Sequence, residues 1–253
     1  MITKKELVEI ARKSDLGLYH QEKDYLLKLF LYLYYKRFED AVFKGGTAIK
    51  FIKGLNRFSE DMDFNISISP KGFQEQVEHI LKEIKAIGIE NSFIKNELFS
   101  EAFTCEIAFY GPLYDGSAQT RNKFRIDAGK RIGTLIKPVW DIIESEYPET
   151  KERFAVKAMD MKEILCEKII SLFQRNKGRD LYDVWFLFNS GVVLDLILLK
   201  RKLNDAQLNE KDFTTKAEYE RDLKYLVPRI IPYEQVKADV LGFMKEIKLG
   251  KQL

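Results

Sequence analysis

Apolar positions recur at helical spacing in the first part of the chain. The segments 21–36 and 71–86 both show this spacing, and Gly88 provides a stop signal for the second. Ahead of them, Thr3 and Glu6 have the spacing of a capping box, which starts a helix. The two predicted apolar faces consist of Tyr25, Leu26, Leu29, Phe30 and Leu33, and of Phe73, Val77, Ile80, Leu81 and Ile84.

Shorter segments favour strands. We expect strands at 62–69, where Pro70 ends the run, and at 92–97, 103–110, 123–128 and 153–158. A glycine turn followed by a short helix is predicted over 43–52. The segment 111–120 is rich in turn-forming residues and predicts a surface loop.

The pattern changes after residue 158, and the remaining chain favours helices. Asp160 and Glu163 have capping-box spacing in front of a helix over 161–177, and a second helix is predicted over 180–189. Segments near 218–226 and 233–247 are amphipathic, whereas 201–216 is expected to be a loop or a frayed helix. We therefore predict an α+β domain over 1–158, including the N-terminal helices, and a helical domain over 159–253.

Composition narrows the class of protein. Of 253 residues, 45% are hydrophobic and 32% are charged, as in ordinary soluble domains. Two cysteines and two histidines are too few for a disulfide framework or a zinc site, and the net charge of +3 does not by itself indicate a nucleic-acid partner. The charged N-terminus and the short apolar runs predict no signal peptide and no membrane span, so we expect a cytoplasmic protein.

The segment 43–65 concentrates the candidate chemistry. Gly45 and Gly46 let the backbone approach a phosphate closely, and a helix that begins near Thr47 supplies N–H groups for an anion. Asp61 and Asp63 are one residue apart, so in a strand their side chains point the same way. Two such carboxylates next to a phosphate site are suited to Mg²⁺.

The order of these motifs resembles a known enzyme family. KGGTAIKFIKGLNRFSEDMDF is similar to the AbiEii/AbiGii toxin family, whose motif is GGTA, a spacer and then R-x-S-x-D-x-D. The broader resemblance is to the polymerase-β-like nucleotidyltransferases, in which Ser usually stands where this chain has Thr47. The resemblance covers about residues 40–190. It implies a mixed sheet with flanking helices, and it assigns Arg57 and Ser59, with Gly45, Gly46 and Thr47, to nucleotide binding.

Two-metal phosphoryl transfer uses ligands that clamp both reacting oxygens, and the resemblance implies that a third acid comes from a later, neighbouring strand. Asp127 is our candidate, since alternation in KFRIDAGKR places it on a polar strand face. Asp115 and Glu106 compete with it. We predict that Asp61, Asp63 and Asp127 form the metal site, and that Asp127 accepts the proton of the attacking hydroxyl.

The helical half carries the later motifs of the same family, a Lys on one helix and R-D-x-x-D on the next. Position by position, the resemblance implies that Lys168 contacts the nucleotide phosphate and that Asp183 holds or orients that phosphate. Both residues would belong to the catalytic set. Arg175, Arg179 and Asp180 would support the nucleotide pocket. Tyr182 and Trp185 are candidates for stacking on a base, but helical core packing explains Trp185 better.

Basic residues cluster within 121–137, where Asp127 is the single acid. Such groups hold phosphate backbones, although a solvated strand edge explains them equally well. The resemblance favours RNA, because acceptors in this family include tRNA. The basic residues are Arg121, Lys123, Arg125, Lys130, Arg131 and Lys137.

The resemblance implies the toxin of a type IV-like toxin–antitoxin pair, with a cognate antitoxin from an adjacent gene. It would transfer NMP from NTP to an RNA acceptor, the 3′ end of tRNA, with release of pyrophosphate and with Mg²⁺ or, alternatively, Mn²⁺. Two alternatives remain open: the same fold acting on a small molecule or a protein, and a degenerate nucleotide-binding scaffold. Phosphorylation of Ser59 would place about two negative charges beside the metal ligands and could switch the enzyme off, but a hydroxyl that caps or orients Arg57 explains Ser59 better.

Overall fold

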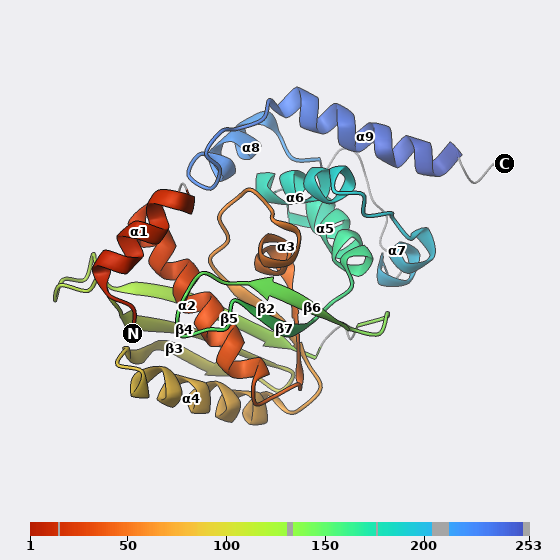
Figure 1. Cartoon of the computed structure of the whole chain (residues 1–253). Helices are drawn as coiled ribbons and strands as arrows, with labels where there is room; N and C mark the ends of the chain where they lie inside the picture. The colour runs from red at the N-terminus through yellow and green to blue at the C-terminus, as the bar shows by residue number, and fades with distance from the viewer. Residues whose placement is uncertain (15, 131–133, 176, 204–212, 250–253) are drawn as a thin grey trace. The chain divides into compact units, whose positions relative to one another are not determined.

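Figure 1 shows the computed structural model of the chain, which describes residues 1–14, 16–130, 134–175, 177–203 and 213–249. These residues divide into two compact units. The first comprises Met1–Ile52, Glu60–Thr134 and Pro138–Ala158, and the second comprises Lys53–Ser59, Leu135–Lys137 and Met159–Leu253. Two short segments that precede residue 158 thus group with the helical unit. The division into separate domains at that residue stays a prediction.

The first unit is built on a mixed sheet. Within the described residues the strand order is β3-β4-β5-β2-β1-β7-β6. β2 runs parallel to β5 and β1 parallel to β7, whereas the other neighbouring pairs are antiparallel. The strands are β1 (Ala41–Lys44), β2 (Met62–Ile66), β3 (Glu90–Leu98), β4 (Ala102–Tyr110), β5 (Asn122–Gly129), β6 (Val139–Glu144) and β7 (Arg153–Ala158).

One face of this sheet is covered by α2 (Leu18–Tyr35) and α4 (Pro70–Ala86), which pack against each other (Figure 1). The Phe30 ring of α2 lies 6.0 Å from Phe124 of β5, and the Phe73 ring of α4 lies 6.1 Å from Phe103 of β4. Aromatic packing of this kind stabilises the core beyond the area it buries. Because side chains alternate along strands, Asp63 of β2, Thr104 of β4 and Asp127 of β5 fall on the opposite face.

The sequence analysis predicts neither β1 nor β6. β1 has only four residues, and VWDIIE of β6 does not alternate, with Trp140 and Ile142 both exposed. The strand predicted over 62–69 is too long, since β2 ends at Ile66. The Ser69 hydroxyl accepts a hydrogen bond from Gly72 N at 3.0 Å and begins α4 instead.

One predicted capping box is present and the other is not. In front of α1 (Lys4–Ser14), Thr3 N donates to Glu6 at 2.7 Å and Glu6 N donates to the Thr3 hydroxyl at 3.2 Å. The box predicted at 160–163 is wrong, because the Glu163 carboxylate accepts hydrogen bonds from Leu135 N and Ile136 N at 2.7 and 3.0 Å. The Asp160 carboxylate still caps the helix that follows, because it accepts from Lys162 N at 2.8 Å, but the reciprocal bond from Glu163 is missing.

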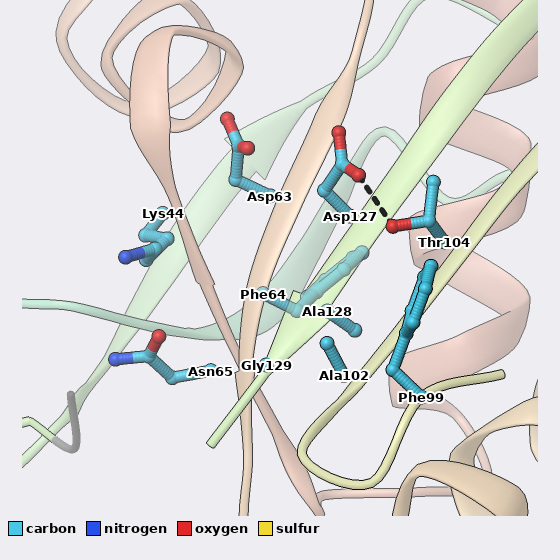
Figure 2. Close-up of a pocket in the computed structure, with 10 residues that line it drawn as sticks. All are labelled: Lys44, Asp63, Phe64, Asn65, Phe99, Ala102, Thr104, Asp127, Ala128 and Gly129. Atoms are coloured by element: carbon cyan, nitrogen blue, oxygen red, sulfur yellow. Dashed lines mark hydrogen bonds between the residues drawn. The ribbon is translucent and has the colours of Figure 1, made fainter. Parts of the chain in front are cut away.

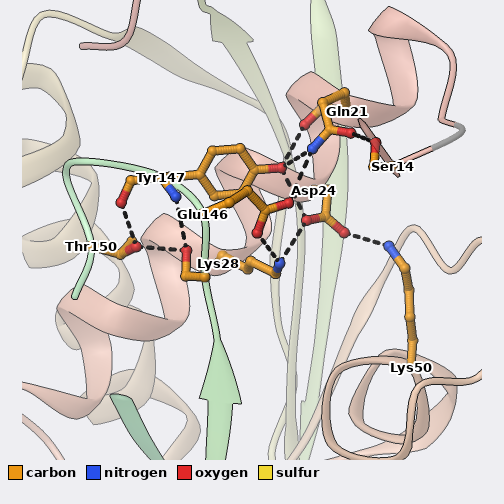
Figure 3. A network of polar contacts seen from close by, with 9 residues as sticks. Ser14, Gln21, Asp24, Lys28, Lys50, Glu146, Tyr147 and Thr150 are labelled. Carbon is orange, nitrogen blue, oxygen red and sulfur yellow. Dashed lines mark hydrogen bonds and ion pairs between the residues drawn. The ribbon is translucent and has the colours of Figure 1, made fainter. Parts of the chain in front are cut away.

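Buried polar contacts fix the helix that follows the glycine turn, α3 (Gly45–Lys53), to α2 (Figure 3). The Asp24 carboxylate of α2 accepts from Lys50 of α3, from Lys28 at 3.2 Å and from the Tyr147 hydroxyl at 3.1 Å. Burial raises the pKa of Asp24, but the charges of Lys50 and Lys28 outweigh that effect and lower it. The N-terminal helices are therefore a scaffold for the glycine turn.

The second unit is helical, as predicted. Its helices are α5 (Met161–Arg175), α6 (Gly178–Asn189), α7 (Leu196–Leu203), α8 (Lys216–Leu223) and α9 (Tyr233–Leu249). α6 packs against α5, α8 and α9. The segment predicted as a loop or frayed helix over 201–216 includes the end of α7, and 204–212 of it lie outside the described residues. No helix in the described part of the chain is long and apolar enough to cross a membrane.

Candidate active site

The glycine turn and the Asp pair are in direct contact. Gly45 has φ +76°, and a Cβ built on it would overlap the Asp63 carboxylate and lie 3.0 Å from Asp63 Cγ. Glycine is thus required here by both backbone conformation and space. The Thr47 hydroxyl of the same turn donates to the Asp61 carbonyl oxygen. The two sequence motifs therefore form one local structure.

Asp127 lies beside Asp63. β2 and β5 are neighbouring parallel strands, and these two residues are partners in their register. Partners in parallel strands project from the same face, so the two carboxylates are adjacent. The competing acids lie elsewhere: Glu106 pairs with Lys123 at 2.7 Å, and Asp115 binds Ser117 and Thr120 within its own loop. Of the three candidates, the structure brings Asp127 to the Asp pair.

Two neighbours hold the Asp127 carboxylate. Thr104 of β4 donates its hydroxyl to Oδ1 at 2.8 Å, and Arg125 reaches Oδ1 and Oδ2, each at 2.8 Å. The hydrogen bond with Asp127 raises the pKa of the Arg125 guanidinium, and the charges of Asp61 and Asp63 add to the rise. Three carboxylates thus act on one cation at this end of the sheet.

A cavity of about 400 Å³ opens along the same strands (Figure 2). Asp63 and Asp127 lie at one end of it, and both carboxylates point the same way in Figure 2. It then continues past Asn65 and Gly129 toward the β3–β4 turn. The lining residues are Lys44, Asp63, Phe64, Asn65, Phe99, Ala102, Thr104, Asp127, Ala128 and Gly129.

The residue types at this edge fit Mg²⁺. Carboxylate oxygens are hard ligands, and Mg²⁺ takes one or two of them together with water and substrate phosphates. Among the described residues, no group of three or more His, Cys, Asp or Glu is arranged to hold a metal ion by itself. An ion at Asp63 and Asp127 would need further ligands from water and a substrate phosphate.

A second group of predicted residues forms a buried charge cluster within the helical unit. Arg57 donates from Nε and Nη2 to the two oxygens of Asp183, at 2.6 and 2.7 Å. Lys168 of α5 binds Asp183 at 2.7 Å and Asp180 at 3.1 Å. Arg175 binds Asp180 at 2.7 Å. The cluster therefore joins the loop before Asp61 to α5 and α6.

Electrostatics keep this cluster charged. Burial raises the pKa of Asp183, but Arg57 and Lys168 outweigh it and bring that pKa to about 2. Burial also raises the pKa of Asp180, and Lys168 and Arg175 again produce a net decrease. Burial lowers the pKa of Arg57, whereas Asp183 causes a larger rise. Each buried charge has an opposite charge in contact, which a buried ion needs.

The remaining predicted residues are placed as follows. Gly46 is buried in the first turn of α3, and Arg179 is half-buried at the start of α6. Ser59 is half-buried in the loop that follows Arg57. Tyr182 is buried, with its hydroxyl 3.4 Å from the Asn56 carbonyl oxygen. The Trp185 indole donates to Asp239 at 2.9 Å, which favours helix packing over base stacking.

The predicted basic cluster is more balanced than its sequence indicates. Lys123 faces Glu106 across the β4–β5 pair, and Arg125 faces Asp127. Asp127 is therefore not the single opposing acid. Arg131 lies outside the described residues, and Lys137 belongs to the helical unit. The exposed Lys130 remains at the end of β5, next to Gly129 of the cavity.

Of the ten cavity residues, sequence reasoning finds Asp63 and Asp127, and four of those it misses bear on the chemistry of the cavity. Thr104 is paired with Asp127 in the β4–β5 register, and Lys44 is paired with Asp63 in the β1–β2 register. Asn65 follows Asp63 by two positions on β2, so period-two alternation could have found it. Phe99 follows β3 and has no sequence signal other than an apolar residue at an expected turn.

Comparisons with known proteins agree with this geometry. The family model described as nucleotidyl transferase AbiEii toxin, type IV TA system, matches residues 32–251. The fold is similar to that of MenT4, a nucleotidyltransferase toxin from Mycobacterium tuberculosis H37Rv, with a TM-score of 0.71 and 16% identity over 96% of this chain and 88% of that one. It is also similar to JHP933 from Helicobacter pylori, with a TM-score of 0.61 and 19% identity over 94% and 96%.

The two structural similarities are too low in sequence identity to show more than the fold, and the predicted α+β nucleotidyltransferase fold is confirmed. No match was found among curated proteins. The family model covers most of the chain, including the glycine turn, the Asp pair, and the Lys168 and Asp183 motifs. The chain belongs to the AbiEii family of nucleotidyltransferase toxins of type IV toxin–antitoxin systems.

Proposed function

We propose that this enzyme transfers the NMP group of a nucleoside triphosphate to the 3′ end of an RNA, with tRNA as the acceptor. The observation that carries the proposal is the placement of Asp63 in register with Asp127, directly against the glycine turn at Gly45. Phosphoryl transfer needs positioned phosphates and fixed charge more than covalent chemistry from the protein. This edge of the sheet offers a turn that can position phosphates and carboxylates that carry fixed charge.

Each part of the edge has a role in the proposed reaction. The backbone N–H groups at Gly45, Gly46 and Thr47 bind the triphosphate, because the first N–H groups of a helix attract anions. The acceptor hydroxyl attacks the α-phosphorus, and the bond from that phosphorus to the pyrophosphate oxygen breaks. A carboxylate oxygen of Asp127 takes the hydroxyl proton, and pyrophosphate leaves.

Asp61 and Asp63 are the proposed holders of Mg²⁺, with Mn²⁺ as a substitute, and Asp127 adds a third carboxylate. When bound, the ion neutralises charge that develops on the phosphate oxygens. Contacts within the protein orient these carboxylates even without the ion. Asp63 contacts the glycine turn, and Thr104 and Arg125 hold Asp127. Such preorganisation reduces the rearrangement needed at the moment of reaction.

The buried cluster supports nucleotide binding through Lys168, whose ammonium group is the proposed phosphate contact in the helical unit. Asp180 and Asp183 fix that ammonium group, so we assign them positioning roles. Arg57 holds the loop that leads to the Asp pair, and Ser59 lies in that loop. Arg175 and Arg179 are proposed to support the same pocket.

The test is incubation of the protein with each α-labelled nucleoside triphosphate, Mg²⁺ and total RNA. Label in a tRNA-sized band supports the proposal, and Asp61→Ala should remove it. Full incorporation by Asp61→Ala would refute the metal assignment. Label in protein or in a small molecule would favour the same chemistry on another acceptor, and binding without transfer would favour a nucleotide-binding scaffold.

A type IV toxin has an antitoxin, and Ser59 gives one way for that partner to act. A phosphate on Ser59 would add about two negative charges within two residues of Asp61. It would repel the triphosphate from the same carboxylates. Intact-mass measurement after co-expression with the product of the adjacent gene tests this hypothesis, and an unmodified chain would count against it.

A further inference from the structure

An exposed aromatic side chain borders the cavity next to the candidate catalytic carboxylates. Phe99 is 52% exposed, although aromatic residues usually bury most of their surface. Figure 2 shows its ring standing beside Thr104, on the other side of the cavity from Lys44 and Asn65. What distinguishes Phe99 from other exposed aromatic residues is its place in the cavity lining, where its ring offers a flat apolar face to a ligand.

The backbone under this ring is fixed. Phe99 N donates to the Ala102 carbonyl oxygen at 2.8 Å, which closes the turn between β3 and β4. Lys130 N donates to the Glu101 carbonyl oxygen at 2.9 Å and holds the turn against the end of β5. A ring on a pinned turn loses little freedom when a ligand stacks on it, which favours binding.

The strand register separates this cavity from the phosphate-binding turn. β1 is antiparallel to β2, with Lys44 opposite Asp63 and Val42 opposite Asn65. Gly45, the next residue after Lys44, therefore lies toward the beginning of β2. The cavity extends the other way, from Asp63 to Asn65 and from Asp127 to Gly129. Asp63 lies between the cavity and the phosphate-binding turn.

This separation matters because phosphoryl transfer proceeds in line. The attacking oxygen and the leaving group lie on opposite sides of the phosphorus that is transferred. With the triphosphate on the glycine turn, the attacking group approaches from the side of Asp127 and the cavity. The cavity is thus placed for the acceptor and not for the incoming nucleotide.

We infer that the cavity binds the terminal nucleotide of the RNA acceptor, with its base stacked on Phe99. Aromatic side chains stack on bases in many single-stranded nucleic-acid sites, and Lys side chains bind the adjoining phosphates. Lys44 lines the cavity, and the exposed Lys130 lies at its edge. The inference rests on the proposed transfer to RNA and deepens it by naming the acceptor subsite.

The experiment compares transfer to two RNA oligonucleotides that both carry a 3′ hydroxyl, one intact and one abasic at its last position. Stacking of one base is worth about 1–3 kcal/mol, so Phe99→Ala should lower kcat/KM for the intact RNA about 10- to 100-fold. The loss should fall on the KM for RNA and leave the KM for NTP unchanged. Phe99→Tyr should restore most of the activity.

Leu98→Ala is the matched control. Leu98 is also exposed, at 48%, and adjoins Phe99, but it does not line the cavity. We expect it to behave as the wild type. The abasic RNA should be a poor acceptor for the wild type and for Leu98→Ala, whereas Phe99→Ala should show no further loss with it. An abasic penalty of the same size in Phe99→Ala and the wild type would overturn the inference.

A binding measurement separates failure of this inference from failure of the proposed function. An oligonucleotide with 2-aminopurine at its 3′ end loses fluorescence when that base stacks. The wild type and Leu98→Ala should quench it, and Phe99→Ala should not. If RNA is labelled but all three proteins quench equally, the subsite is wrong and the function stands. If no RNA is labelled, the proposed function fails. If, in addition, the wild type does not quench the 2-aminopurine fluorescence, or all three proteins quench it equally, the subsite is wrong as well.

Discussion

Two acid-rich regions of this protein use the same residue types in opposite ways. At the sheet edge, the Asp127 side chain is 35% exposed and borders a cavity. In the helical unit, the Asp183 side chain is 0% exposed, and both of its oxygens contact cations of the protein. Arg125 also contacts both oxygens of Asp127, but that ion pair is exposed beside the cavity, whereas the ion pair of Asp183 with Arg57 is closed to solvent.

The role of an acidic motif therefore depends on how deeply its carboxylates are buried. A buried, fully paired carboxylate contributes geometry and stability, because removal of one partner leaves an uncompensated charge. A half-exposed carboxylate in an exposed ion pair contributes little stability, because water screens the pair. It is correspondingly available for chemistry.

Asp63→Asn should lower the rate of nucleotide transfer about 10³-fold, because the loss of a metal ligand removes several kcal/mol of transition-state stabilisation. Its thermal unfolding should match that of the wild type. Single-turnover transfer of labelled nucleotide measures the rate. A variant with the wild-type rate would show that Asp63 takes no part in catalysis.

Asp183→Asn should lower the free energy of unfolding by about 3–5 kcal/mol, since it leaves Arg57 buried without its counter-charge and leaves Lys168 with Asp180 alone. Urea denaturation measures this change. Asp127→Asn is the matched substitution at the sheet edge, and it should change the unfolding free energy by no more than about 1 kcal/mol. Equal losses in the two variants would contradict the distinction between the regions.

Gly45→Ala should reduce transfer about 100-fold, because its Cβ would displace the Asp63 carboxylate from the reacting geometry. Gly54→Ala is the control. Gly54 also has a positive φ, +72°, but a Cβ there would meet nothing within 4 Å. Both variants should lose about 1 kcal/mol or more of stability from backbone strain. Similar activity in the two would mean that the contact with Asp63 has no catalytic importance.

Acid should weaken the buried cluster within a defined window. Asp183 has a folded-state pKa of about 2 against an ordinary value of 3.8, so its contribution is present above pH 4 and is lost as pH falls toward 2. A shift of this size corresponds to about 2 kcal/mol. The difference in unfolding free energy between the wild type and Asp183→Asn should therefore shrink by that amount from pH 5 to pH 2. A constant difference would show that Asp183 is not the titrating group.

The sequence predicts those features that depend on neighbouring residues. Gly45, Asp61 and Asp63 lie within one short segment, and periodicity places most of the helices and the strands β2, β3, β4, β5 and β7. Asp127 could be proposed because strand alternation and the resemblance both point to it. Asp63 and Asp127 are close in the structure because of the register between β2 and β5, and a local sequence pattern can only suggest such a register.

The remaining features depend on pairings between distant residues. Arg57 has no sequence signal for Asp183, which is 126 positions away. Glu163 is predicted to close a local cap, but it holds the backbone at Leu135 and Ile136. The cavity requires four strands and one turn to come together, so Thr104 and Phe99 gain their significance only in the fold.

We propose that the sheet edge holds a divalent cation together with the triphosphate, whereas the buried cluster maintains the fold and positions Lys168 but does not bind the cation. Electron paramagnetic resonance of Mn²⁺, titrated into the protein with saturating nucleoside triphosphate, tests it most directly. We predict that the wild type and Asp183→Asn, the latter at a temperature where it is folded, bind Mn²⁺ alike, and that Asp63→Asn binds it at least about 10-fold more weakly. Unchanged binding by Asp63→Asn, or lost binding by folded Asp183→Asn, would contradict the claim.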